Sequence, residues 1–166
     1  MSSFGLPRPR RNPACAPQSF FTKELPAGPD KNTAMSEKVV TFGEVMLRLS
    51  PPGHLRLLQT VSLDMTFGGA EVNVAVSLAM LGMDAAFVTR LPKNDVAQAC
   101  VNQIRGLGVD TSKILRGGDR MGVYFVEKGA AQRASTVLYD RAHSAIAEID
   151  PAELDWDAIF EGAKAF

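Results

Sequence analysis

Two consecutive glycines stand directly before an apolar segment with one early asparagine, in Phe67-Gly68-Gly69-Ala70-Glu71-Val72-Asn73-Val74-Ala75. Such glycines let the backbone approach a ligand closely, and the start of the following helix offers unpaired N–H groups to an oxygen-rich molecule. The Asn73 amide can both donate to and accept from hydroxyls. A tight turn entering a buried helix, with Asn73 as a cap, explains the same residues equally well. The spacing alone leaves both interpretations open.

Other candidate residues give weaker indications of a metal-binding or catalytic role. His54 and His143 have no Cys, His or carboxylate at metal-ligand spacing, so each is expected to be a polar loop residue and no metal site is predicted. Asp119 follows two glycines, as in a catalytic Gly-Asp loop. A strand pattern rather than a helix follows it, so Asp119 is expected in a turn.

Charge and cysteine content exclude several classes of protein. Eighteen Lys and Arg balance eighteen Asp and Glu, which gives no electrostatic reason to expect nucleic acid or an anionic membrane as partner. No apolar run approaches the roughly 20 residues that span a bilayer. Cys15 and Cys100 are far apart and form no CxxC motif. A reduced, cytoplasmic protein is therefore expected.

The first 34 residues differ in composition from the rest. They hold six of the ten prolines, which remove backbone donors and fix φ. We predict that residues 1–36 are a disordered or artefactual extension, and Met35 is a candidate start. The alternative is a transit peptide, suggested by early arginines without acids, but the prolines interrupt any amphipathic helix.

Regular patterns that could position the glycine segment begin at Lys38. Val39 to Leu49 predicts a first strand with a bulge at Gly43-Glu44, and Leu55 to Phe67 predicts a half-exposed strand or hairpin. A helix is expected from Ala70 to Leu81, closed by Gly82. Because this helix has almost no polar face, we expect it to be buried between other layers.

A second strand and helix follow. Asp84 to Leu91 predicts the strand, and Asn94-Asp95 should cap a helix whose apolar face carries Val96, Cys100, Ile104 and Leu107. This order of elements predicts a βαβ unit with parallel strands and a right-handed crossover.

The last third changes pattern. Met121–Lys128 and Ala134–Tyr139 alternate around a glycine-containing turn and predict an antiparallel hairpin. Asp150-Pro151-Ala152-Glu153 resembles a capping box and predicts a helix through Ile159. Residues 163–166 are typical of the approach to another strand.

Longer segments of the chain resemble one enzyme family. GGAEVNVAVSLAMLG is similar to the first signature region of the PfkB carbohydrate kinases. TFGEVMLRLSPPGHLRLLQ, FVTRLPKND and VLYDRAHSAI resemble segments of the 2-keto-3-deoxygluconate kinases within that family. The resemblance covers residues 38–166 nearly without gaps. It implies an α/β fold, a ribokinase-like doubly wound sheet, here partial, with a small antiparallel β lid.

The resemblance also implies a sugar-binding site. A guanidinium suits a carboxylate or paired oxygens, and tyrosines offer an apolar wall with a polar tip. Without the resemblance, packed tyrosines and a surface arginine would be the simpler interpretation. The residues implied to bind substrate are Gly68, Gly69, Asn73, Tyr124, Tyr139, Arg141 and Glu44.

We expect the groups that carry out phosphoryl transfer to lie outside these residues. Neither the Gly-Ala-Gly-Asp loop of PfkB kinases nor a Walker motif occurs in this chain. The resemblance therefore implies that residues 37–166 are the N-terminal part of a kinase domain, without a catalytic residue or a recognisable cofactor site, and inactive alone. A complete enzyme would use ATP and Mg²⁺.

Several functions stay open at this point. The resemblance implies phosphorylation of 2-keto-3-deoxygluconate to its 6-phosphate. A fructokinase or another PfkB sugar kinase is the alternative enzyme, and a non-catalytic sugar-binding module is the alternative class. The expected partner is a small sugar acid. Strands that lack their sheet neighbours expose apolar edges, so a homo-oligomer through the β lid is also expected.

Overall fold

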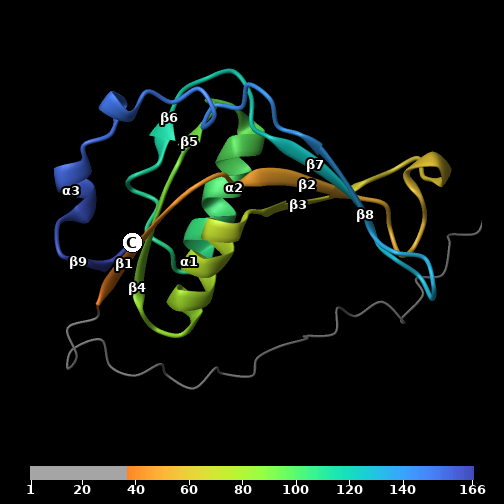
Figure 1. Cartoon of the computed structure of the whole chain (residues 1–166), viewed down its shortest axis with the longest axis horizontal. Helices are drawn as coiled ribbons and strands as arrows, with labels where there is room; N and C mark the ends of the chain where they lie inside the picture. Colours follow the sequence, from red (N-terminus) through yellow and green to blue (C-terminus); the bar gives the residue numbers. More distant parts are fainter. Residues whose placement is uncertain (1–36) are drawn as a thin grey trace, which may run out of the picture. The chain divides into compact units, whose positions relative to one another are not determined.

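The computed structural model describes residues 37–166, which form two larger sheets and one two-stranded sheet (Figure 1). The predicted extension over residues 1–36 lies outside the described residues. A parallel sheet has the order β4-β1-β9, formed by β1 (Lys38–Phe42), β4 (Asp84–Val88) and β9 (Ala163–Ala165). A parallel pair, β5 (Arg90–Leu91) and β6 (Leu115–Arg116), follows on from β4. The parallel strands and the expected last strand are confirmed.

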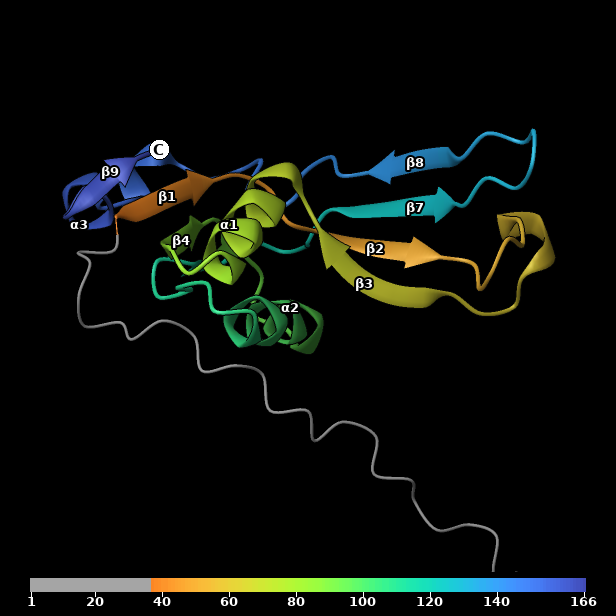
Figure 2. The ribbon, with the colours of Figure 1, turned by 90° about the horizontal axis from the view of Figure 1, so that it is seen from below.

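The second sheet, which we call the lid sheet, contains four strands in the order β3-β2-β7-β8 (Figure 2). They are β2 (Met46–Ser50), β3 (Asp64–Gly68), β7 (Val123–Glu127) and β8 (Thr136–Asp140). The predicted hairpin is confirmed as β7 and β8, which pair antiparallel. The lid sheet is not antiparallel throughout, because β2 and β7 pair in parallel.

The predicted single strand from Val39 to Leu49 was wrong. The chain leaves β1 after Phe42 and enters the lid sheet at Met46, so the expected bulge is a crossing between two sheets. Gly43 N–H still donates to Val88 O of the parallel sheet, while Leu47 N–H donates to Gly122 O next to β7. In the following segment only Asp64–Gly68 is a strand, since η1 (Leu57–Gln59) is a 3₁₀ turn.

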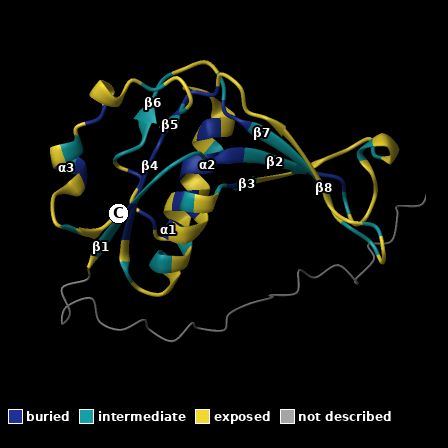
Figure 3. Ribbon diagram, in the orientation of Figure 1, coloured by how far each residue is buried: buried dark blue, intermediate teal, exposed yellow. Residues whose placement is uncertain are grey.

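Helix α1 (Ala70–Met80) ends as the sequence predicts. Gly82 has φ 87°, its N–H donates to Ala79 O, and Met83 N–H donates to Leu78 O, which together form a Schellman motif. The expectation of a helix buried between other layers was wrong for the described residues, because only Val72 and Ala75 of α1 are buried and the rest of the helix is half-buried or exposed (Figure 3). No described element packs over the outer side of this helix.

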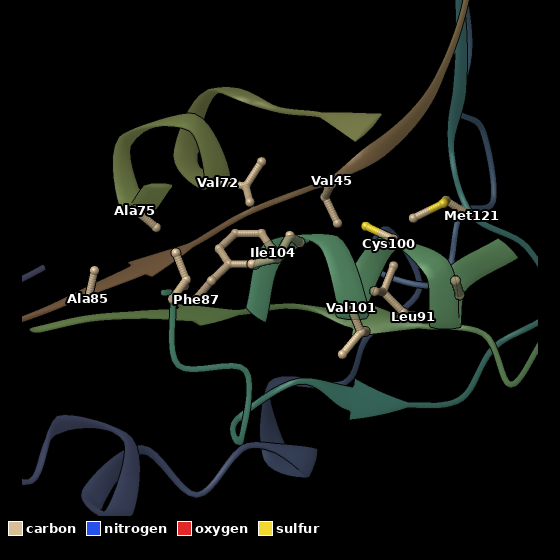
Figure 4. Close-up of a cluster of buried hydrophobic side chains, with 12 residues drawn as sticks. Val45, Val72, Ala75, Ala85, Phe87, Leu91, Cys100, Val101, Ile104 and Met121 are labelled. Carbon is tan, nitrogen blue, oxygen red and sulfur yellow. The ribbon is translucent and has the colours of Figure 1, made fainter. Parts of the chain in front are cut away.

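Helix α2 (Asp95–Gly106) also begins at its predicted cap, since Asn94 Oδ1 accepts a hydrogen bond from Ala97 N–H at 2.9 Å. Its buried face differs from the predicted one at the edges. Ala97, Cys100, Val101 and Ile104 are buried, whereas the expected Val96 and Leu107 are exposed. Cys100 and Ile104 pack with Phe87 of β4 and Val72 of α1 in the main core (Figure 4).

The predicted helix from Pro151 through Ile159 is broken in two. Asp150 and Glu153 form the predicted capping box, but they close only a 3₁₀ turn, η2 (Pro151–Glu153). Asp155 then caps α3 (Trp156–Phe160) by accepting from Ala158 N–H at 3.1 Å. A second capping residue within five positions starts a new helix instead of extending the first. Over residues 37–166, no helix is long and apolar enough to cross a bilayer.

Candidate sugar-binding site

A cavity lies where the crossing from β1 to β2 meets the start of α1 and the end of β8. Its volume is about 500 Å³. Four of its nine lining residues have polar or charged side chains, and the others are glycine or apolar. The lining comprises Gly43, Glu44, Met46, Ala70, Glu71, Tyr139, Arg141, Ile146 and Ala147.

Glu44 is held in place by two side chains from the segment after β8. Arg141 Nη2 lies 2.6 Å from Glu44 Oε2, and Ser144 Oγ donates to Glu44 Oε1 at 2.8 Å. The Glu44 side chain is only 9% exposed, whereas that of Arg141 is 54% exposed. A guanidinium carries five donors, so Arg141 can hold Glu44 and still bind a ligand.

Gly68 and Gly69 lie beside this network, at positions where a side chain would not fit. A Cβ atom on Gly69 would collide with the backbone carbonyl of Glu44, and one on Gly68 would lie 2.9 Å from Tyr124 Oη. The φ of Gly69 is −176°, which any residue can adopt. Close approach of the backbone, rather than an unusual conformation, therefore explains Gly69.

The two tyrosines form a stacked pair on the lid sheet. Tyr124 and Tyr139 are opposite each other in β7 and β8, with ring centroids 5.9 Å apart and planes inclined by 25°. Tyr139 is 63% exposed and lines the cavity, with Tyr124 between it and Gly68. Tyr139 is therefore not a core residue, and its ring face is open to a ligand.

Of the predicted site residues, Glu44, Tyr139 and Arg141 line this cavity. Gly68, Gly69 and Tyr124 lie next to its lining, whereas Asn73 belongs to another cavity. Asn73 lines a smaller cavity of about 280 Å³ with Val45, Phe67 and Val72. Asn73 follows Glu71 by two residues, which places it about 200° further around the helix. Glu71 therefore faces the larger cavity and Asn73 does not.

Glu71 is the residue of most chemical interest that the sequence interpretation missed. Its carboxylate lies against Gly43, where a Cβ atom would collide with it. An acid in the first turn of a helix is usually explained by the helix dipole. The signal that could have found Glu71 is its place directly after Gly-Gly-Ala, in the first turn of the helix.

Comparison with known proteins decides the family. The pfkB family of carbohydrate kinases matches residues 36–164 of the chain. The chain belongs to this family. A solved structure of 2-dehydro-3-deoxygluconokinase from Thermotoga maritima shares 57% identity with a TM-score of 0.76, over 77% of this chain and 39% of that one.

Two further relatives agree with this PfkB assignment. The 2-dehydro-3-deoxygalactonokinase of Haloferax volcanii is 40% identical over 132 residues, 80% of this chain and 41% of the relative. A PfkB family carbohydrate kinase structure from Listeria grayi has 38% identity and a TM-score of 0.73, over 76% of this chain and 39% of that one. The α/β ribokinase-like fold is thereby confirmed. The chain spans about two fifths of the length of these relatives.

Proposed function

We propose that the complete protein is an ATP-dependent kinase that phosphorylates 2-keto-3-deoxygluconate on its terminal hydroxyl, giving the 6-phosphate. Residues 37–166 are, in this proposal, the N-terminal part of the kinase domain, and their contribution is to bind the sugar acid. The names of the relatives from Thermotoga maritima and Haloferax volcanii support a 2-keto-3-deoxy sugar acid as the substrate class. The proposal keeps the cytoplasmic location expected from the two isolated cysteines.

The observation that carries the proposal is the Glu44–Arg141 pair in the wall of a cavity of about 500 Å³. A sugar acid needs acceptors for its hydroxyls and a cation for its carboxylate, and this pair places one of each side by side. Carboxylate oxygens have two lone pairs each, so Glu44 can accept from a hydroxyl in addition to its present partners. The Arg141 fork suits the carboxylate of the substrate.

The remaining predicted residues receive supporting roles in this proposal. Tyr139, backed by Tyr124, gives the apolar carbon chain of the sugar a flat surface. Gly68 and Gly69 keep the start of α1 close to Glu44, so that backbone N–H groups of its first turn can face sugar oxygens. A role for Asn73 rests on the family resemblance alone.

The described residues do not fit ATP or Mg²⁺. The charged residues of the larger cavity are two carboxylates and one arginine, which disfavour a triphosphate, and no lysine lines either cavity. Within residues 37–166 there is no group of three or more His, Cys, Asp or Glu that could hold a metal ion. Phosphoryl transfer needs both ligands, so no step of it is assigned to these residues.

The test is an ATP-dependent coupled assay on the protein expressed from its complete open reading frame. We expect kcat/KM for 2-keto-3-deoxygluconate to exceed that for fructose by about tenfold or more, because only the acid can form a charge-assisted bond with Arg141. Calorimetry of the same sugars without ATP separates binding from transfer. Equal or better use of fructose would replace this proposal by the general ketose-kinase alternative.

A further inference from the structure

Arg48 lies in the middle of the lid sheet, on the same face as the residues that line the cavity. It is opposite Tyr124 on β7 and opposite Thr66 on β3. Residues directly opposite each other share a face, and so do residues two apart on one strand. Arg48 therefore shares a face with Tyr139, through Tyr124, and with Met46 of its own strand. Both Tyr139 and Met46 line the cavity.

The guanidinium of Arg48 has no partner among the described residues. Its Nε is buried and makes no hydrogen bond, and no ion pair of residues 37–166 includes it. Arg116 also has a buried Nε without a partner, but its two terminal nitrogens donate to Gln98 Oε1 and Pro92 O. Buried donors are satisfied in most proteins, so the unpaired Nε of this half-buried arginine is a donor that an acceptor from outside the described residues could pair.

The charges at the cavity indicate which acceptor would be favoured. The lining carries Glu44, Glu71 and Arg141, which gives two negative charges and one positive charge. Arg141 already pairs with Glu44, so Glu71 remains uncompensated at the lining. A sugar acid adds a second negative charge to this site. A further cation facing the same space would offset the repulsion between the two carboxylates.

We propose that Arg48 is a second cationic contact for the substrate carboxylate and determines the preference for sugar acids over neutral sugars. This inference rests on the proposed function, since it assumes a sugar acid in the cavity. Arg48 is not part of the cavity lining itself but lies two residues along β2 from Met46, which is. In this proposal its long side chain extends towards the bound acid, while Arg141 binds from the end of β8. The two arginines then bind the same carboxylate, one from β2 and the other from the residue that follows β8.

The experiment compares Arg48→Met, which keeps much of the side-chain length without the charge, with Arg48→Lys, which keeps the charge. Arg56→Ala, in an exposed arginine of the segment between β2 and β3, is the matched control. Each variant of the protein from the complete reading frame is titrated with 2-keto-3-deoxygluconate and with fructose by calorimetry without nucleotide, and then assayed with ATP. Thermal unfolding is measured in parallel.

We expect Arg48→Met to weaken binding of the acid by about ten- to a hundredfold and to leave fructose within about threefold. Arg48→Lys should recover part of the loss, and Arg56→Ala should change neither sugar. An equal loss for both sugars, or a lower unfolding temperature without loss of preference, would show that Arg48 only packs against Tyr124 and would overturn this inference alone. Failure of the unaltered protein to bind or use the acid would overturn the proposed function as well. Should Arg48→Met not fold, Arg48→Gln carries the same comparison.

Discussion

Arg141 Nη2 lies 2.6 Å from Glu44 Oε2, an ion pair that joins the end of the lid sheet to the crossing between β1 and β2. The carboxylate is nearly buried and the guanidinium is half exposed. One partner is therefore fixed by the protein, whereas the other has donors free for a ligand. Because Arg141 keeps exposed donors while it holds Glu44, we expect this pair to contribute to ligand binding as well as to the position of Glu44.

The first prediction concerns Arg141 itself. Arg141→Ala should lower kcat/KM for 2-keto-3-deoxygluconate by roughly one to two decades, the equivalent of about 1.5–3 kcal/mol for a charge-assisted hydrogen bond. Arg141→Lys should recover only part, because an ammonium cannot form the bidentate fork. Fructose, which has no carboxylate, serves as the internal control. Small equal effects on both sugars would mean that Arg141 is a solvated surface residue.

The second prediction concerns the hydroxyl that holds Glu44 from its other oxygen. Ser144 is 1% exposed, and Ser144→Ala removes its hydrogen bond to a nearly buried carboxylate. We expect the free energy of unfolding to fall by about 1.5–3 kcal/mol and binding of the sugar acid to weaken. Urea unfolding and calorimetry measure the two effects. Ser62→Ala, at an exposed position before β3, is the control and should change neither.

The third prediction tests whether position 69 requires glycine because the backbone of Glu44 comes close, rather than because of an unusual backbone conformation. Gly69→Ala places a methyl group against the Glu44 carbonyl, which should lower the free energy of unfolding by about 1–3 kcal/mol and displace the Glu44 carboxylate. Gly106→Ala, at the end of α2, meets no atom within 4 Å and should raise it by about 0.4–1 kcal/mol. Urea unfolding of both variants gives the signs. A stable Gly69→Ala variant with unchanged sugar binding would contradict the packing seen here.

The fourth prediction is a pH dependence that originates in the core. Burial raises the pKa of the Cys100 thiol from 9.0 to about 12, and the positive charge of Arg116 offsets part of this rise. Because the folded pKa lies above the unfolded one, the contribution of Cys100 to stability is complete below pH 9 and is lost as the pH rises towards 12.

This dependence is measured by urea unfolding at pH 8 and pH 10. The free energy of unfolding of the unaltered protein should fall more between these pH values than that of Cys100→Ala, in which nothing titrates at this position. Other groups titrate equally in both proteins and cancel in the comparison. An identical decline in the two proteins would mean that the buried thiol ionises as easily as a free one.

The sequence by itself determined the local elements and the family. The C-terminal cap of α1 at Gly82, the cap of α2 at Asn94 and the hairpin of β7 and β8 all form where their residues predict them. These signals act through hydrogen bonds and turn conformations within a few residues, so the residues next to each other in the sequence are sufficient to identify them.

The tertiary structure decided which residues meet. The sequence does not show that the run from Val39 to Leu49 divides between two sheets, because both halves have the same apolar, β-branched character and only their distant partners differ. For the same reason a capping box could predict a longer helix than the 3₁₀ turn at Pro151–Glu153, which is followed by the competing cap at Asp155.

For the candidate site, the sequence predicts several of the residues, and the tertiary structure decides which of them come into contact. Glu44, Tyr139 and Arg141 were named from the sequence resemblance, yet the ion pair and the cavity they share come from the folding of the β1–β2 crossing against the end of β8. The rotation of α1 about its axis turned Glu71 towards this cavity and Asn73 towards the smaller one. Residue type sets what chemistry a side chain can do, but its direction depends on contacts between segments that are far apart in the chain.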